Sequence, residues 1–214
     1  MLLGGLQKLS LIDYPGKLAA VVFTLGCNFR CGFCHNPELV LPALIKKQSR
    51  LAEADFFKFL RTRQGKIDGV VVTGGEPTLH QDLPDFISQI KKLGFLVKLD
   101  TNGSCPEMLR ILLEQKLLDY IAMDIKSSPE RYHRACGLTK INLSTIQKSI
   151  DFIKNSALPY NFRTTLAPNV VSEKDISQIR QWLGLAPYGA WLGETGVKLV
   201  LQEFRPEKTL AQYL

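Results

Sequence analysis

Three cysteines within eight residues carry the strongest chemical signal in the sequence. Cys27, Cys31 and Cys34 follow the spacing Cys-x3-Cys-x2-Cys inside the segment 26–36. Thiolates are the soft ligands of iron-sulfur clusters, and a loop of this length can wrap three sulfur atoms around one face of a four-iron cubane. Three protein ligands leave one iron open to a further molecule. The spacing therefore predicts a four-iron four-sulfur cluster with a vacant coordination position.

A zinc site is the alternative for the same segment. The three thiolates and the imidazole of His35 form a ligand set that suits tetrahedral zinc. Zinc knuckles usually pair their ligands as Cys-x2-Cys or Cys-x2-His, whereas His35 directly follows Cys34. Because adjacent residues are awkward joint ligands, we favour the cluster.

A second candidate motif, Gly74-Gly75-Glu76-Pro77, follows the next predicted strand. The two glycines permit a close backbone approach, and the Glu76 carboxylate could accept hydrogen bonds from an ammonium group. Read alone, the motif is an ordinary turn. Beside a cluster, it predicts a binding position for the amino group of a ligand.

Polar residues also stand at the ends of three later strands. The segments are Asp100-Thr101-Asn102-Gly103, Met123-Asp124-Ile125-Lys126 and Phe162-Arg163-Thr164-Thr165. Such residues are common in turns, so each segment alone is weak evidence of function. An inward-facing Arg163 could pair with a ligand carboxylate or a substrate backbone, or it could form a salt bridge at the rim of the fold. Both readings stay open.

The cysteine motif resembles that of the radical S-adenosylmethionine (SAM) superfamily, in which an aromatic residue, here Phe33, precedes the last cysteine. The Gly-Gly-Glu-Pro turn resembles the SAM amino-group motif of that family. The resemblance implies that SAM occupies the open iron, with Gly74, Gly75 and Glu76 at its amino group and with Phe33 and His35 nearby. It also implies one-electron cleavage of SAM to a 5′-deoxyadenosyl radical that abstracts hydrogen.

The later strand ends resemble those of glycyl-radical enzyme activases, which carry Asp-Thr-Asn-Gly and Asp-x-Lys segments. The resemblance implies that Thr101 and Asn102 line the SAM site, that Lys126 meets the SAM carboxylate or ribose, and that Asp124 lies towards the glycine-bearing loop of a partner. It further suggests a monovalent cation, whose ligands would be Asp100, Thr101, the Ala122 carbonyl and Asp124. Oxygen ligands suit a hard cation, and the cation would offset repulsion between two neighbouring carboxylates.

The segments 9–17 (LSLIDYPGK) and 34–38 (CHNPE) are similar to those of anaerobic ribonucleoside-triphosphate reductase activating proteins. The resemblance covers nearly the whole length of the chain. This resemblance implies that the chain makes a glycyl radical on a partner enzyme, with electrons from a flavodoxin or ferredoxin. Arg205 follows Phe204 where some activases have Pro-Tyr-His, so that histidine contact is absent or moved. The alternatives are an activase of a pyruvate formate-lyase-type enzyme, a radical SAM enzyme acting on a small molecule or tRNA, and a non-catalytic zinc-binding module.

The residues around these motifs predict an α/β fold. Short apolar runs alternate with amphipathic stretches, which is typical of β/α units and a parallel sheet. The predicted strands are 18–25, 69–73, 95–100, 120–125, 160–166 and 197–202, and the predicted helices are 52–63, 82–92, 107–116, 143–155 and 173–183. Six units cannot close an eight-stranded barrel, so we expect an open, partial (β/α)6 TIM-type barrel with its functional residues at the carboxyl edge.

Composition sets the remaining expectations. A chain of 214 residues with 45% hydrophobic and 22% charged residues fits one soluble domain over residues 1–214. Its 27 basic and 20 acidic residues are scattered, which gives no stripe for nucleic acid. Neither a secretory start nor an apolar run near the ~20 residues of a membrane span is evident. Five cysteines, an odd number, favour a metal site in the cytoplasm, with Cys105 and Cys136 expected to be structural.

Overall fold

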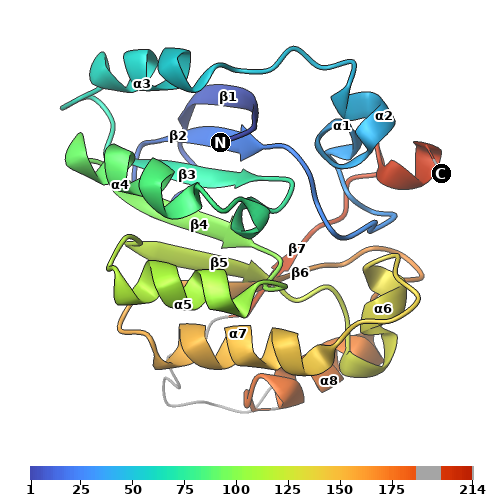
Figure 1. Ribbon diagram of the computed structural model, residues 1–214. Helices are drawn as coiled ribbons and strands as arrows, with labels where there is room; N and C mark the ends of the chain where they lie inside the picture. The colour runs from blue at the N-terminus through green and yellow to red at the C-terminus, as the bar shows by residue number, and fades with distance from the viewer. Residues whose placement is uncertain (187–198, 214) are drawn as a thin grey trace.

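A single sheet of seven strands forms the centre of the computed structural model, which describes residues 1–186 and 199–213 (Figure 1). The strands lie side by side in chain order: β1 (Leu3–Ser10), β2 (Ala19–Thr24), β3 (Gly69–Gly74), β4 (Leu96–Thr101), β5 (Tyr120–Asp124), β6 (Tyr160–Thr165) and β7 (Leu199–Gln202). β2 to β7 are parallel, and β1 and β7 form the two open edges. This is the predicted α/β fold, an open partial barrel. The predicted first residues of the last strand, 197 and 198, lie outside the described residues.

One strand differs from the prediction. β1 pairs antiparallel with β2, with Leu6 opposite Val22, so the sheet has a seventh strand before the six parallel ones. Its sequence, LGGLQKLS, contains two glycines and no β-branched residue, and both features weaken a strand signal. β1 forms because it covers the edge of the strand that leads into the cysteine loop, residues 26–36.

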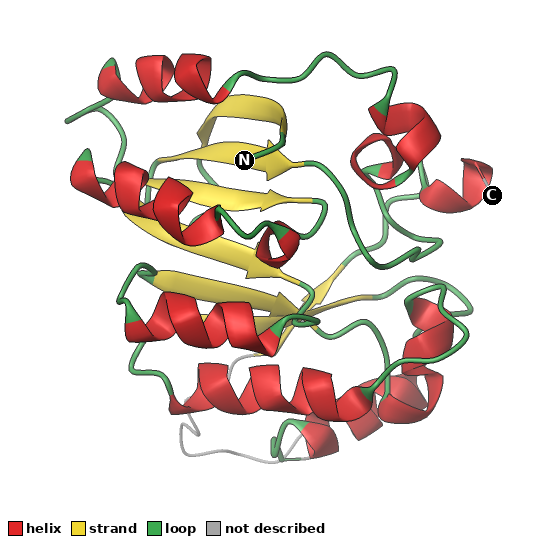
Figure 2. Ribbon diagram, in the orientation of Figure 1, coloured by secondary structure: helices red, strands yellow, loops and turns green. Residues whose placement is uncertain are grey.

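Helices cover the outside of this sheet (Figure 2). The five long helices begin and end within two residues of the predicted first and last residues: α3 (Glu53–Arg61), α4 (Leu83–Lys92), α5 (Pro106–Glu114), α7 (Leu143–Asn155) and α8 (Glu173–Trp182). Three four-residue helices were not predicted: α1 (Pro37–Val40), α2 (Pro42–Ile45) and α6 (Tyr132–Ala135). Within the described ranges, no helix has both the length and the apolar character needed to cross a bilayer.

The two faces of the sheet have different chemistry. In β4, Val97 and Leu99 face the main core under the helices, whereas the alternate residues Lys98 and Asp100 face the inside of the barrel and contact each other. At the amino end, the inside is apolar, because Tyr14 packs there against a small cluster of strand residues and lies 5.9 Å from the Tyr120 ring. Polar groups therefore collect in the carboxyl half of the barrel.

Asp175 connects the start of α8 to the loop after β5. Its buried carboxylate accepts hydrogen bonds from the Ser172 backbone (2.8 Å), the Ser128 hydroxyl (2.6 Å) and Arg131 (2.9 Å), and Ser172 and Asp175 form a capping box. Burial alone would raise the pKa of Asp175, but the Ser128 and Ser172 hydrogen bonds outweigh it and lower the pKa to about 2.

A carboxyl group whose pKa is lowered by folding adds stability above its unfolded pKa, and that stability is lost as the pH falls through the folded value. We expect Asp175→Asn to lower the free energy of unfolding at pH 6 by about 1–3 kcal/mol. The difference from the wild type should shrink between about pH 4 and pH 2, from the ordinary to the lowered pKa. Urea unfolding of both proteins at several pH values measures this difference. A gap that does not change with pH would contradict the assignment.

The C-terminal segment, residues 203–213, returns to the cysteine loop, and Figure 1 shows the C-terminus beside α1 and α2. The backbone N–H groups of Leu210 and Ala211 donate to the carbonyls of Cys34 and Gly32, both at 2.9 Å. The Leu210 side chain is fully buried. This segment therefore holds the backbone around the last cysteine.

Candidate functional site

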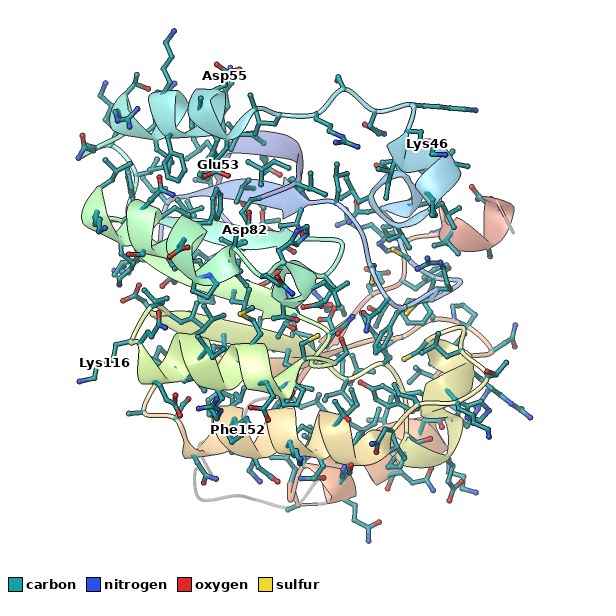
Figure 3. The ribbon with its side chains drawn as sticks, viewed as in Figure 1. Lys46, Glu53, Asp55, Asp82, Lys116 and Phe152 are labelled. Carbon is teal, nitrogen blue, oxygen red and sulfur yellow. The ribbon has the colours of Figure 1, made fainter. Side chains whose placement is uncertain are left out.

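A cavity of about 230 Å³ opens at the carboxyl ends of the parallel strands. In Figure 3, Lys46 on the segment after α2 marks this end of the sheet, and Lys116 marks the opposite end. Of the predicted site residues, Ala122, whose carbonyl was expected as a cation ligand, is not among those that line the cavity. The others all line it: Cys27, Cys31, Phe33, Cys34, His35, Gly74, Gly75, Glu76, Asp100, Thr101, Asn102, Asp124, Lys126 and Arg163. The structure thus brings together residues from the ends of four strands, β3 to β6, and the cysteine loop.

Backbone contacts on several sides hold the cysteine loop in place. Gly26 N–H donates to the Leu39 carbonyl at 2.7 Å, and Cys34 N–H donates to the Cys31 carbonyl at 3.0 Å. Glu76 N–H also donates to the Gly26 carbonyl at 2.7 Å. A Cβ atom on Gly75 would lie only 1.9 Å from that carbonyl oxygen, so this close approach needs glycine.

The three thiols differ in their electrostatic surroundings. Burial raises the pKa of Cys27 to about 12, and the charge of Glu76 adds to the rise. Burial also raises the pKa of Cys34. A hydrogen bond from Cys136 lowers the pKa of Cys31. Because a metal-bound cysteine is a thiolate, cluster binding has to displace protons that this cavity otherwise keeps on Cys27 and Cys34.

Glu76 is the centre of a buried hydrogen-bond network. One carboxylate oxygen accepts from the Thr78 backbone (3.1 Å) and the Thr101 hydroxyl (2.7 Å), and the other accepts from the Asn102 backbone (2.6 Å). Only 1% of Glu76 is exposed, and burial raises its pKa. All of these partners are neutral donors, which is the arrangement suited to an ionised carboxylate. This carboxylate lines the cavity, and no cation among the described residues pairs with it.

Asn102 joins this network to the cysteine loop. Its side-chain amide donates to Asn28 at 3.0 Å and to the Cys27 sulfur at 3.8 Å, and its carbonyl oxygen accepts from Ser104 N–H at 2.9 Å. The Phe29 N–H also donates to the Cys27 sulfur, at 3.4 Å. Hydrogen bonds to a ligating sulfur are a known means of tuning an iron-sulfur centre.

Arg163 forms salt bridges with both carboxylates of the predicted cation site, Asp100 and Asp124. Its guanidinium donates to Asp100 at 3.0 Å and to Asp124 at 2.8 Å, and Lys126 pairs with Asp124 at 2.8 Å. Burial would raise the pKa of Asp124, but the charges of Arg163 and Lys126 outweigh it and hold that pKa well below its usual range. Arg163 lies between the two carboxylates and pairs with both, so their repulsion is already offset by a side chain of the protein. Arg163 makes the rim salt bridges and also lines the cavity.

Phe33, His35 and Lys126 complete the cavity wall near the cysteines. Lys126 Nζ lies 5.9 Å from the centre of the Phe33 ring. The His35 ring packs against Phe204 at 5.8 Å, and its Nε2 is buried with no hydrogen-bond partner in the described part of the chain. Arg205, which stands where some activases have histidine, is exposed. A buried, unpartnered imidazole nitrogen beside three thiols and a cation-free carboxylate fits a cavity that takes a polar ligand.

Sequence reasoning missed Cys136 as a neighbour of the cysteine loop. Cys136 is fully buried, as expected, but its thiol contacts Cys31.

Over residues 1–186 and 199–213, no three His, Cys, Asp or Glu side chains converge as the ligands of one metal ion do. The three thiols of the loop instead surround a cavity, and a four-iron cluster spaces its ligands more widely than one zinc ion does.

The comparisons with known proteins agree with this geometry. The Radical SAM superfamily model matches residues 21–183. A Methanocaldococcus jannaschii protein named as a glycyl-radical enzyme activating enzyme is 38% identical over 184 residues, which are 83% of this chain and 73% of that protein. A Listeria monocytogenes pyruvate formate-lyase-activating enzyme is 27% identical over 190 residues, with 85% of this chain and 75% of that enzyme covered.

Solved structures show the same fold at low sequence identity. Streptococcus suis SuiB bound to S-adenosylmethionine has a TM-score of 0.60 and 14% identity, and the match covers 88% of this chain and 43% of SuiB. The structure described as native anSMEcpe with bound AdoMet also has a TM-score of 0.60, with 16% identity and coverage of 84% and 49%. The chain thus spans less than half of each of these larger proteins.

Proposed function

Because the chain belongs to the radical SAM superfamily, it is an enzyme that uses a four-iron four-sulfur cluster and SAM, and we propose that Cys27, Cys31 and Cys34 hold that cluster. Its general function is that of a glycyl-radical enzyme activase, the activity named for its relatives. One observation carries the assignment of the site: three thiols of one loop and a buried carboxylate without a cation line the same cavity.

Bound together, the reduced cluster and SAM supply a carbon-centred radical able to abstract a hydrogen atom. The residues of this chain bind and orient. We assign the ammonium group of SAM to Glu76, because its buried carboxylate accepts only from neutral donors and pairs with no cation among the described residues. Thr101 and Asn102 keep that carboxylate in position, and Asn102 also links it to Cys27.

Two cationic side chains also line the cavity. Lys126 and Arg163 both line it, and each pairs with Asp124. We assign the SAM carboxylate or ribose to Lys126, and the SAM carboxylate or the substrate backbone to Arg163. Phe33 and His35 line the same cavity. Asp124 would face the glycine-bearing loop of the partner. A monovalent cation at Asp100, Thr101 and Asp124 stays a prediction. Arg163 pairs with both carboxylates, so a cation is not needed to offset their charge.

The proposed substrate is a glycine residue of a partner protein, and the most specific candidate is an anaerobic ribonucleoside-triphosphate reductase. Support comes from the segments 9–17 and 34–38 and from a sheet that does not close, which leaves its edges β1 and β7 apart. A pyruvate formate-lyase-type partner is the second candidate, since several relatives with 27–28% identity are activases of that enzyme. The proposed electron donor is a flavodoxin or a ferredoxin.

The test is anaerobic incubation of the reconstituted protein with SAM, reduced flavodoxin and each candidate partner in turn. We expect a doublet electron-paramagnetic-resonance signal of a glycyl radical with the reductase. The signal should disappear when the radical-bearing glycine of the partner is replaced by alanine.

A glycyl radical only on the pyruvate formate-lyase-type enzyme would reassign the partner. SAM cleavage without a glycyl radical on any partner, together with a modified small molecule or tRNA, would contradict the activase. Bound zinc without iron or sulfide would contradict the whole site.

A further inference from the structure

A fourth thiol, outside the cysteine motif, contacts the cavity from behind. Cys136 follows α6 and has no exposed surface, and its thiol lies beside that of Cys31. Cys31 lines the cavity, whereas Cys136 does not. Cys105 differs, because its sulfur has the Ser104 hydroxyl as a partner at 3.8 Å. Cys136 is therefore a thiol that reaches the cavity only through Cys31.

The backbone fixes this contact. Arg30 N–H donates to the Cys136 carbonyl at 2.7 Å, which places residue 136 directly beside the middle of the cysteine loop. The next residue, Gly137, has a positive φ of 65°, and a Cβ atom there would lie 2.1 Å from the Arg30 carbonyl oxygen. The two chain segments therefore touch along their backbones, which keeps Cys136 beside the cysteine loop.

We propose that Cys31 and Cys136 form a reversible disulfide when a hydroperoxide removes the cluster. The proposal rests on the proposed function, because it treats Cys31 as a cluster ligand. While Cys31 is bound to iron, Cys136 has no thiol to pair with. Once the cluster is lost, Cys31 is exposed to the cavity, and Cys136 remains in contact with it.

The chemistry balances with hydrogen peroxide as the oxidant. The Cys31 sulfur attacks the O–O bond, forming a sulfenic acid and releasing water. The Cys136 sulfur then attacks the Cys31 sulfur, gives up its proton and releases the second water as the disulfide forms. Two thiols thus supply the two electrons that reduce one peroxide. Without Cys136, a second peroxide would carry Cys31 on to sulfinic acid, which thiols cannot reverse.

Peptide mapping of the full-length holoenzyme tests the proposal. The reconstituted protein is treated anaerobically with hydrogen peroxide until its cluster absorbance is lost, and free thiols are then alkylated under denaturing, non-reducing conditions. We expect a disulfide peptide joining Cys31 to Cys136 as the main cross-link. Dithiothreitol followed by iron and sulfide should restore most of the cluster.

Two serine variants make the result specific. Cys136→Ser should bind as much iron as the wild type before peroxide, but afterwards it should accumulate sulfinic and sulfonic acid on Cys31 and recover several-fold less cluster. Cys105→Ser should give the wild-type map and recovery. A cross-link confined to Cys27, Cys31 and Cys34, or a Cys136 that is still alkylated after complete cluster loss, would overturn the proposal.

The experiment distinguishes a failure of the disulfide proposal from a failure of the proposed function. Neither the peptide map nor the iron count requires a partner enzyme or SAM cleavage. If the protein binds no cluster, the proposed function fails, and peroxide treatment of the metal-free chain still reports whether Cys31 and Cys136 join.

Discussion

Replacement of Cys27, Cys31 or Cys34 by alanine is expected to reduce the glycyl-radical yield by more than about 100-fold. A loss of that size corresponds to about 2.7 kcal/mol or more of transition-state stabilisation. The physical reason is that a cluster with two protein thiolates is no longer anchored in the cavity that Glu76 and Asn102 shape around Cys27. Iron and sulfide counted per chain, the cluster absorbance and the glycyl-radical signal measure the effect.

Cys105→Ala is the matched control, because Cys105 lies outside the cavity lining. It should keep the iron content and the radical yield of the wild type. The three loop variants should still fold, since each change removes one small side chain. A loop variant with wild-type iron content would mean that its cysteine is not a cluster ligand, whereas a Cys105 variant without iron would point to a different ligand set.

Substitution of Glu76 should have the largest effect on stability. Glu76→Ala leaves the backbone N–H groups of Thr78 and Asn102 and the Thr101 hydroxyl without their acceptor inside the protein. Each unsatisfied buried group costs about 1–3 kcal/mol, so for three groups we expect a loss of about 3–9 kcal/mol in the free energy of unfolding. Urea unfolding measures this loss, which is a large part of the ~5–15 kcal/mol of a typical domain.

Glu76→Gln separates stability from SAM binding. The amide keeps the shape of the side chain, but it is neutral and turns an N–H₂ group towards neighbours that are themselves donors. We expect the folded protein to bind SAM at least tenfold more weakly, as measured by calorimetry on the cluster-loaded form.

Glu107→Gln is the matched control for both Glu76 variants, because Glu107 is an exposed residue whose salt bridge with Arg110 lies on the surface. Its stability should change by less than about 1 kcal/mol. Wild-type SAM affinity in Glu76→Gln would contradict the ammonium assignment.

Local sequence signals predicted the elements that carry the site. β3 reads GVVVTG and is buried on both sides, which gives the continuous apolar run of a central parallel strand. The helix predicted over residues 173–183 starts directly after Ser172, whose side chain forms a capping box with Asp175. Because parallel strands end at one edge, strand limits alone were enough to bring Glu76, Asn102 and Lys126 to one cavity.

Contacts between distant segments could not be read from local pattern. Cys136 reaches Cys31 because α6 and Gly137 pack on the cysteine loop, and α6 is too short to give a helical period. The pairing of Arg163 with Asp100 and Asp124 depends on the register of three strands, in which Asp124 lies opposite Arg163. The sequence shows which residues are charged, but it does not show which of them form salt bridges with one another.

The C-terminal segment also sets an order of events during synthesis. Cys34 is added to the chain 176 residues before Leu210, from the residue numbers 210 and 34 of the bonded pair. At about 5–20 residues per second, roughly 9–35 s pass before the ribosome adds the partner of the Cys34 carbonyl. For that time the three thiols are present while their loop lacks its last backbone restraints. Cluster insertion into the fully restrained loop therefore has to follow the synthesis of Leu210 and Ala211.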